Sequence, residues 1–234
     1  MTHLRKMMLE ELQRRNYAQN TVRAYIRIVE RFARHFGRSP EKLGPDQIRE
    51  YQVHLFRDQH LSPGTVEQHV AALRFLYVKT LKRPYMHEHL PMPKRQRPLP
   101  EILSPAEVER LLDSAKNLYH RAMLMTLYST GMRRSEMCRL RVSDIDSERM
   151  VVHIHYGKGG RDRDVPLSGK LLDTLREYWR WMKPKTWLFP GTVEHLRADV
   201  PISTKISWDA CRQAAQRAGI RKRVTPHVLR NASA

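Results

Sequence analysis

LYSTGMRRSEMC, residues 127–138, joins two segments that each have a helical pattern. An apolar run typical of a helix ends at Thr130-Gly131, and a second helical pattern begins almost at once. Glycine tolerates the left-handed backbone conformation that commonly ends a helix. The stretch therefore predicts a helix break at Gly131, with Arg133 at the start of the next helix.

Arg133 is an unusual residue for that position. The start of a helix gathers unpaired backbone N–H groups and the positive end of the dipole, so a cation there is unfavourable. An anion held between the like charges would explain it. Glu136 lies one turn further on and can hold the guanidinium in place. Two interpretations follow: an anion-binding site, or a surface helix with a solvated arginine.

The bulk composition indicates a polyanionic partner. The chain has 234 residues, a formal net charge of +19 and a pI of about 10.4. So large a positive charge makes the basic side chains repel one another, and binding to a nucleic acid would relieve that repulsion. The alternative is a basic protein without such a partner. Two cysteines argue against a disulfide framework. We expect a soluble, cytoplasmic protein, because no apolar run reaches the length of a membrane span or forms a signal-peptide core.

Residues 1–82 are nearly all helical in pattern. Four short apolar stripes at helical spacing predict a small bundle, with Asn20 as the cap of the second helix and Gly37 as its end. Gly44-Pro45 and Ser62-Pro63 are typical helix starts. Basic residues follow the outer faces of these helices and suit a phosphate-facing surface, although such charges usually just solvate a helix. They are Arg23, Arg27, Arg31, Arg34, Lys42 and Arg74.

Residues 83–100 form a predicted linker. Five prolines in this stretch disfavour helix and favour an extended strap. The basic residues Lys94, Arg95 and Arg97 suit a strap that follows a DNA backbone. His87-Glu88-His89 lacks the i, i+4 histidine spacing of zinc proteases, so no metal site is predicted there.

Residues 101–234 predict a mixed α+β domain. Ser104, Pro105 and Glu107 form a strong helix start, and Ser168, Ser203 and Thr225-Pro226 are further ones. Between them, residues 150–156 and 161–167 alternate around Gly157-Lys158-Gly159-Gly160, which predicts a β-hairpin. Lys158 at its tip is free to reach outward, or is simply an exposed hairpin lysine. His227 and Arg230 share one face of the last helix.

Three motifs in order resemble the tyrosine recombinases, the phage-integrase and Xer-like family of site-specific DNA recombinases. The motifs read TGMRRSE, GKGGRDRDVPL and TPHVLR, and they follow a helical N-terminal region and a basic linker. The resemblance covers essentially the whole chain. It implies a mainly α fold, in which an N-terminal four-helix core-binding (SAM-like) domain precedes a mixed α+β catalytic domain with a small β-hairpin or sheet.

The resemblance also implies roles for individual residues. Arg133, Lys158, His227 and Arg230 would be catalytic, with Glu136 as the supporting acid. Additional DNA contacts are expected from Lys94, Arg95, Arg97, Arg134, Arg161 and Arg163. The family cleaves one strand with a tyrosine, forms a 3′-phosphotyrosyl bond and uses no metal or other cofactor. Two arginines suit this chemistry, because their planar forks bind a phosphate bidentately and stabilise its charge.

The chain departs from the family pattern near its end. Asn231 replaces the histidine that commonly follows the arginine of the last motif, and no tyrosine comes after Tyr178. We therefore expect no nucleophile in these 234 residues, as in a truncated or interrupted product. Intact members form tetramers on paired DNA sites. The alternatives are a recombinase and a catalytically inactive DNA-binding fragment, both with double-stranded DNA as partner and without a membrane.

Overall fold

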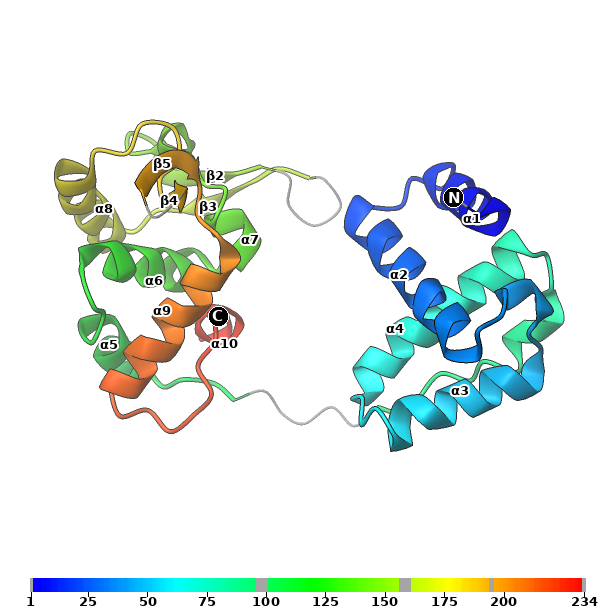
Figure 1. Cartoon of the computed structure of the whole chain (residues 1–234). Helices are drawn as coiled ribbons and strands as arrows, with labels where there is room; N and C mark the ends of the chain where they lie inside the picture. The colour runs from blue at the N-terminus through cyan, green and yellow to red at the C-terminus, as the bar shows by residue number, and fades with distance from the viewer. Residues whose placement is uncertain (1, 96–100, 156–160, 194–195, 233–234) are drawn as a thin grey trace. The chain divides into compact units, whose positions relative to one another are not determined.

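The computed structural model describes residues 2–95, 101–155, 161–193 and 196–232. The chain divides into two compact units, Met1–Pro98 and Leu99–Ala234, each with its own hydrophobic core (Figure 1). The predicted fold class is confirmed: a mainly α chain with an N-terminal helical unit and a C-terminal mixed α+β unit. Within the described residues, every helix is too short or too polar to cross a bilayer.

The N-terminal unit is a small helical bundle. Its elements are α1 (His3–Gln13), α2 (Gln19–Phe36), the 3-10 turn η1 (Pro40–Lys42), α3 (Pro45–Arg57), α4 (Pro63–Arg74), the π-helical turn η2 (Phe75–Thr80) and the 3-10 turn η3 (Pro84–His87). Large side chains such as Phe32, Leu73 and Tyr77 are fully buried in its core. The Tyr77 hydroxyl is satisfied there, because it donates to the carbonyl oxygen of Pro40 at 2.9 Å.

Most helix ends of this unit lie at the residues that the sequence predicted. Gly37 ends α2 in the left-handed conformation at φ 61°, and Ser62 caps α4 by accepting from the N–H of Thr65. The predicted cap at Asn20 is wrong. The N-cap is Ala18, which makes no side-chain cap hydrogen bond, so Asn20 lies inside the first turn.

The predicted extended strap is wrong in its first half. Pro84 opens η3, and Met86 and Leu90 are fully buried in the core of the N-terminal unit. Arg74 secures this segment by donating from Nε to the carbonyl oxygen of Leu90 at 2.8 Å. Proline prevents an α-helix interior but fits the first position of a short helical turn, and two apolar side chains then fix the turn to the bundle.

The C-terminal unit combines helices with two small antiparallel sheets. Its helices are α5 (Pro105–Asp113), α6 (Leu118–Thr130), α7 (Arg134–Met137), the 3-10 turn η4 (Val142–Asp144), α8 (Gly169–Met182), α9 (Thr204–Arg217) and α10 (Pro226–Asn231). Its strands are β1 (Ile145–Asp146), β2 (Val151–Ile154), β3 (Arg163–Pro166), β4 (Pro190–Val193) and β5 (Leu196–Pro201).

The predicted hairpin is confirmed as β2 and β3, which pair antiparallel with Val152 opposite Val165 and Ile154 opposite Arg163. Strand β1 extends the sheet on the other side of β2. The β4–β5 pair was not predicted. It follows Leu188 and Phe189, which are buried as expected for a connector.

Helix α6 is the centre of the C-terminal unit. Residues 122–127 are all buried, and α8, α9 and α10 pack around this helix (Figure 1). A helix that is apolar all round is stable only when neighbours cover every side. Its C-terminal end at Gly131 is therefore held firmly by packing, and the residues that follow leave from a fixed point.

Gly131 should be sensitive to substitution because its φ is +57°. Gly131→Ala should destabilise the chain by about 1–2 kcal/mol, since a Cβ is strained in the left-handed region. Gly169→Ala is the matched control, because Gly169 has ordinary φ and nothing lies within 4 Å of an added Cβ. Its stability should be unchanged or slightly raised. Denaturant unfolding of both variants checks this, and equal losses would contradict the strain argument.

Candidate functional site

Arg133 lies three residues after Thr130, the last residue of α6, in an extended conformation with φ −73° and ψ 150°. It is the N-cap of α7, but α7 is a single turn of four residues. The predicted second helix is thus a single turn, and a dipole argument loses its force in so short a helix. The charge around Arg133 instead depends on side chains.

Glu136 is the partner of Arg133. Its Oε2 accepts the backbone N–H of Arg133 at 2.8 Å, and its Oε1 accepts from Nη1 of the same residue at 2.8 Å. Arg163 on β3 adds a fork, with Nη1 3.1 Å from Oε1 and Nη2 2.7 Å from Oε2. The side chain of Glu136 is only 6% exposed, whereas both arginine side chains are 35% exposed.

The ionised state of Glu136 is strongly favoured. Burial alone would raise the pKa of Glu136, but hydrogen bonds from Arg163 and then Arg133 outweigh it and lower that pKa to about 2. One carboxylate therefore serves two guanidinium groups, and the trio keeps a formal charge of +1. A cationic centre with unused N–H donors is chemically suited to bind an anion.

His227 and Arg230 are on α10, which Thr225 caps by accepting from the N–H of Val228. His227 is exposed and Arg230 is half-buried. Helix α10 packs against α6 and α9, so the pair belongs to the same helical cluster that fixes the start of the Arg133 segment (Figure 1). Lys158 lies outside the described residues.

The root of the hairpin carries two histidine–carboxylate pairs. His153 Nδ1 is 2.7 Å from Asp164, and His155 Nδ1 is 2.9 Å from Asp162, across the two strands. The hydrogen bond with Asp162 raises the pKa of His155, which also lies 3.5 Å from the buried Asp144. No group of three metal-ligating side chains occurs among the residues that the structure describes.

A cavity of about 560 Å³ lies beside this hairpin and α7. It is lined by Ser135, Glu136, Arg139, Leu140, Arg141, Asp144, His153, Ile154, His155 and Trp187. Arg141 stacks over the Trp187 ring at 5.4 Å, and the buried Asp144 caps the local turn by accepting from the N–H of Arg141. Glu136 thus lines a cavity of mixed polar and apolar walls in addition to contacting the two arginines.

The basic residues predicted to contact DNA fall into different environments. Arg134, Arg161 and Lys94 are exposed, whereas Arg163 is committed to Glu136. Arg95 pairs loosely with Glu67 at 3.5 Å. Arg97 lies outside the described residues. The partnership of Arg163 was missed because an arginine two residues before a valine-proline step gives no local signal of its distant partner.

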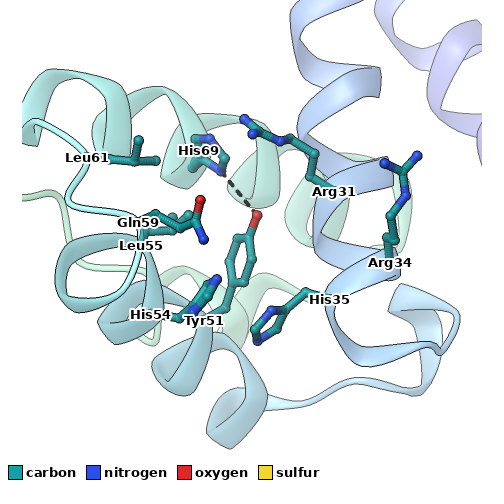
Figure 2. Close-up of a pocket in the computed structure, with 9 residues that line it drawn as sticks. All are labelled: Arg31, Arg34, His35, Tyr51, His54, Leu55, Gln59, Leu61 and His69. Carbon is teal, nitrogen blue, oxygen red and sulfur yellow. Dashed lines mark hydrogen bonds between the residues drawn. The ribbon is translucent and has the colours of Figure 1, made fainter.

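The N-terminal unit has a cationic cavity of about 210 Å³, shown in Figure 2. Its lining consists of Arg31, Arg34 and His35 from α2, Tyr51, His54 and Leu55 from α3, Gln59 and Leu61 from the next loop, and His69 from α4. None of these is a carboxylate, and Arg31 and Arg34 make no ion pair with any described residue. The Tyr51 hydroxyl lies 3.4 Å from Nδ1 of the buried His69, whose pKa is lowered by burial and by Arg31.

Both cysteines are buried and unpaired. Burial raises the pKa of the Cys138 thiol, and it raises the pKa of Cys211 to about 12. A thiol that stays protonated is a poor nucleophile and a poor metal ligand. Neither cysteine is therefore part of a reactive site.

The depressed pKa of Glu136 has a measurable consequence. The folded pKa of about 2 lies below the ordinary value of 4.5, so its ionised form adds stability above about pH 4.5 that is lost as the pH falls toward 2. Glu136→Gln should cost up to about 3 kcal/mol at neutral pH and progressively less in acid. The exposed Glu109→Gln is the control and should change stability by less than about 0.5 kcal/mol. Urea unfolding against pH checks this, and a pH-independent loss would contradict it.

Comparisons with known proteins find relatives for both units of the chain. Residues 101–234 match the phage integrase family, and residues 4–87 match the phage integrase N-terminal SAM-like domain. A putative integrase/recombinase of Sinorhizobium fredii is 47% identical over 235 residues, which cover 100% of this chain and 75% of that protein.

Two solved structures are similar in fold. The crystal structure of XerA recombinase matches at a TM-score of 0.52 and 26% identity, over 98% of this chain and 81% of that one. Lambda integrase (residues 75–356) bound to DNA matches at a TM-score of 0.76 and 17% identity, over 100% and 85% of the two chains. Family models match both units, and a relative that is 47% identical matches over the whole of this chain. The chain therefore belongs to the phage integrase family of tyrosine recombinases.

Proposed function

We propose that the chain binds duplex DNA and holds one backbone phosphodiester at Arg133, for site-specific strand cleavage and rejoining of the kind its family performs. The observation that carries this proposal is the arginine held by a buried carboxylate that cannot neutralise it, because Arg163 shares the same carboxylate. A fixed guanidinium with charge to spare is what the non-bridging oxygens of a reacting phosphate need.

In this proposal four side chains act on the phosphate. Arg133 and Arg230 bind its oxygens, His227 exchanges a proton as acid or base, and Lys158 protonates the leaving 5′-oxygen. Support comes from the placement of Arg133 just beyond α6 and of His227 and Arg230 on α10, which packs on α6. Removal of one such oriented donor typically lowers the rate about 10²–10³-fold. No metal or other cofactor enters this scheme.

The N-terminal unit would add to the affinity for DNA by binding further backbone phosphates. The cavity of Figure 2 offers two arginines that make no ion pair with a described residue, together with His35 and His69. Its third histidine, His54, is paired with the carboxylate of Asp58 at 2.6 Å. Such a hollow is suited to a single backbone phosphate. Exposed Arg134, Arg161 and Lys94 would contribute further contacts, which carry no sequence information but fix the protein on the duplex.

A second candidate function is DNA binding without cleavage. All nine tyrosines of the sequence lie at or before residue 178, ahead of the His227 and Arg230 motif. The last of them, Tyr178, is fully buried, and its hydroxyl donates to the carbonyl oxygen of Leu188 at 2.8 Å. That hydroxyl is therefore unsuited to attack a phosphate, which favours DNA binding without cleavage by these 234 residues.

Assembly and location follow from the same proposal. Lambda integrase, a structural neighbour at 16% identity, has been solved as a tetramer bound to a Holliday junction. By the family resemblance, this chain would associate with copies of itself on paired DNA sites. Because its proposed partner is DNA, the chain would act in the cytoplasm.

DNA affinity should depend steeply on salt. The logarithm of the affinity should fall linearly with the logarithm of salt concentration, with a slope near −0.9 for each phosphate neutralised. Arg31→Gln combined with Arg34→Gln should reduce that slope by about 0.9 per lost contact. Arg49→Gln on the exposed face of α3 is the control, because Arg49 is outside the cavity lining. Fluorescence anisotropy with a labelled duplex measures both, and a flat salt response would contradict the proposal.

Covalent chemistry distinguishes the two candidate functions. Incubation with nicked suicide DNA should give no protein–DNA adduct on a denaturing gel, because the last tyrosine is buried and hydrogen-bonded. An intact relative with its nucleophile is the positive control. An adduct formed by these 234 residues would refute the binding-only candidate and identify a nucleophile among them.

A further inference from the structure

Arg163 differs from its neighbour Arg161, although sequence analysis gave both the same role. Arg161 is exposed and makes no ion pair with any described residue. Arg163 places its whole fork on Glu136, at 3.1 Å and 2.7 Å. The bond between them raises the pKa of Arg163 and lowers that of Glu136. An arginine engaged in this way is badly placed to meet a DNA phosphate directly.

The carboxylate of Glu136 is filled by its four donors. Each of its oxygens accepts one bond from Arg133 and one from Arg163. A carboxylate offers about four lone-pair sites, so half of them would be vacant without Arg163. A buried carboxylate with vacant sites would draw in more N–H groups of Arg133, because unsatisfied buried charge is costly.

We propose that Arg163 is a positioning residue, which acts through Glu136 to fix the guanidinium of Arg133 and to keep it from closing on the carboxylate as a neutral pair. This inference rests on the proposed role of Arg133 in binding a phosphate. In the structure, Arg133 gives Glu136 only one of its five side-chain N–H groups, and no other described residue accepts from the rest. Arg163 thus preserves both the direction and the charge of the phosphate-binding arginine.

The geometry requires an arginine at position 163. Its planar fork reaches both carboxylate oxygens at once and fixes the plane of the carboxyl group. A lysine would keep the charge but contact the pair as a single point. Arg163→Lys therefore separates positioning by the fork from a simple contribution of positive charge.

The test uses the full chain, labelled with ¹⁵N. The side-chain Nε–Hε signal of Arg133, assigned by its loss in Arg133→Lys, reports the guanidinium directly. Inorganic phosphate is the probe, and the variants are Arg163→Gln, Arg163→Lys and the matched control Arg161→Gln. In Arg163→Gln and Arg163→Lys, we expect a shifted Arg133 signal in the absence of phosphate. Both variants should also bind phosphate at Arg133 about tenfold more weakly. Arg161→Gln should leave both readouts as in the original chain.

Several results would overturn the inference. The inference fails if Arg163→Gln and the original chain bind phosphate at Arg133 with equal affinity. An Arg163→Lys variant that behaves like the original chain would show that charge alone matters. Backbone amide signals of α6 and α8, in the same unit as Arg163, report folding in every variant. Arg163→Lys retains the ion pair if Arg163→Gln unfolds.

A double variant tests the route through Glu136. Arg163→Gln should add little to the loss already caused by Glu136→Gln, because both act on Arg133 by the same contact. Fully additive losses would contradict that route. If phosphate leaves the Arg133 signal of the original chain unchanged, the proposed function of Arg133 fails, whereas the ligand-free shift still decides whether Arg163 positions it.

Discussion

The buried carboxylate of Glu136 is the interaction on which the C-terminal site depends. A basic chain places two guanidinium groups within reach of each other, which is unfavourable unless a negative group lies between them. Four hydrogen bonds offset the cost of removing the carboxylate from water, and the two from Arg163 join α7 to β3. Because α7 is a single turn that would not persist alone, this bond and the packing of Met137 give it a fixed place.

Local chemistry explains why much of the fold was predictable. The break at Gly131 needs a left-handed residue, and Ser104 and Thr225 supply caps that the first turns of their helices require. The hairpin is also local, because alternation on both sides of a glycine-rich turn specifies its pairing. In each case the residues that determine the structure are within a few positions of it.

Long-range packing explains what sequence reasoning missed. Arg163 and Glu136 are 27 positions apart, so their partnership exists only once the sheet lies beside α7. Residues 83–90 were predicted to be extended because they begin a proline-rich stretch, yet Met86 and Leu90 are buried in the bundle core. Sequence reasoning gave no end for the helix after Gly131. Helix α7 ends at Met137, and beyond it Leu140 pairs with a distant segment, because its carbonyl oxygen accepts from the N–H of Leu188.

The two buried thiols give the chain a practical property. Because Cys138 and Cys211 are protonated and shielded from solvent, maleimide reagents should not react with them in the native state. One cysteine introduced on the surface of each unit would then be the only site of that unit to take a dye or spin label. The separation of the two units, with and without duplex, thereby becomes accessible to spectroscopy without removing any native residue.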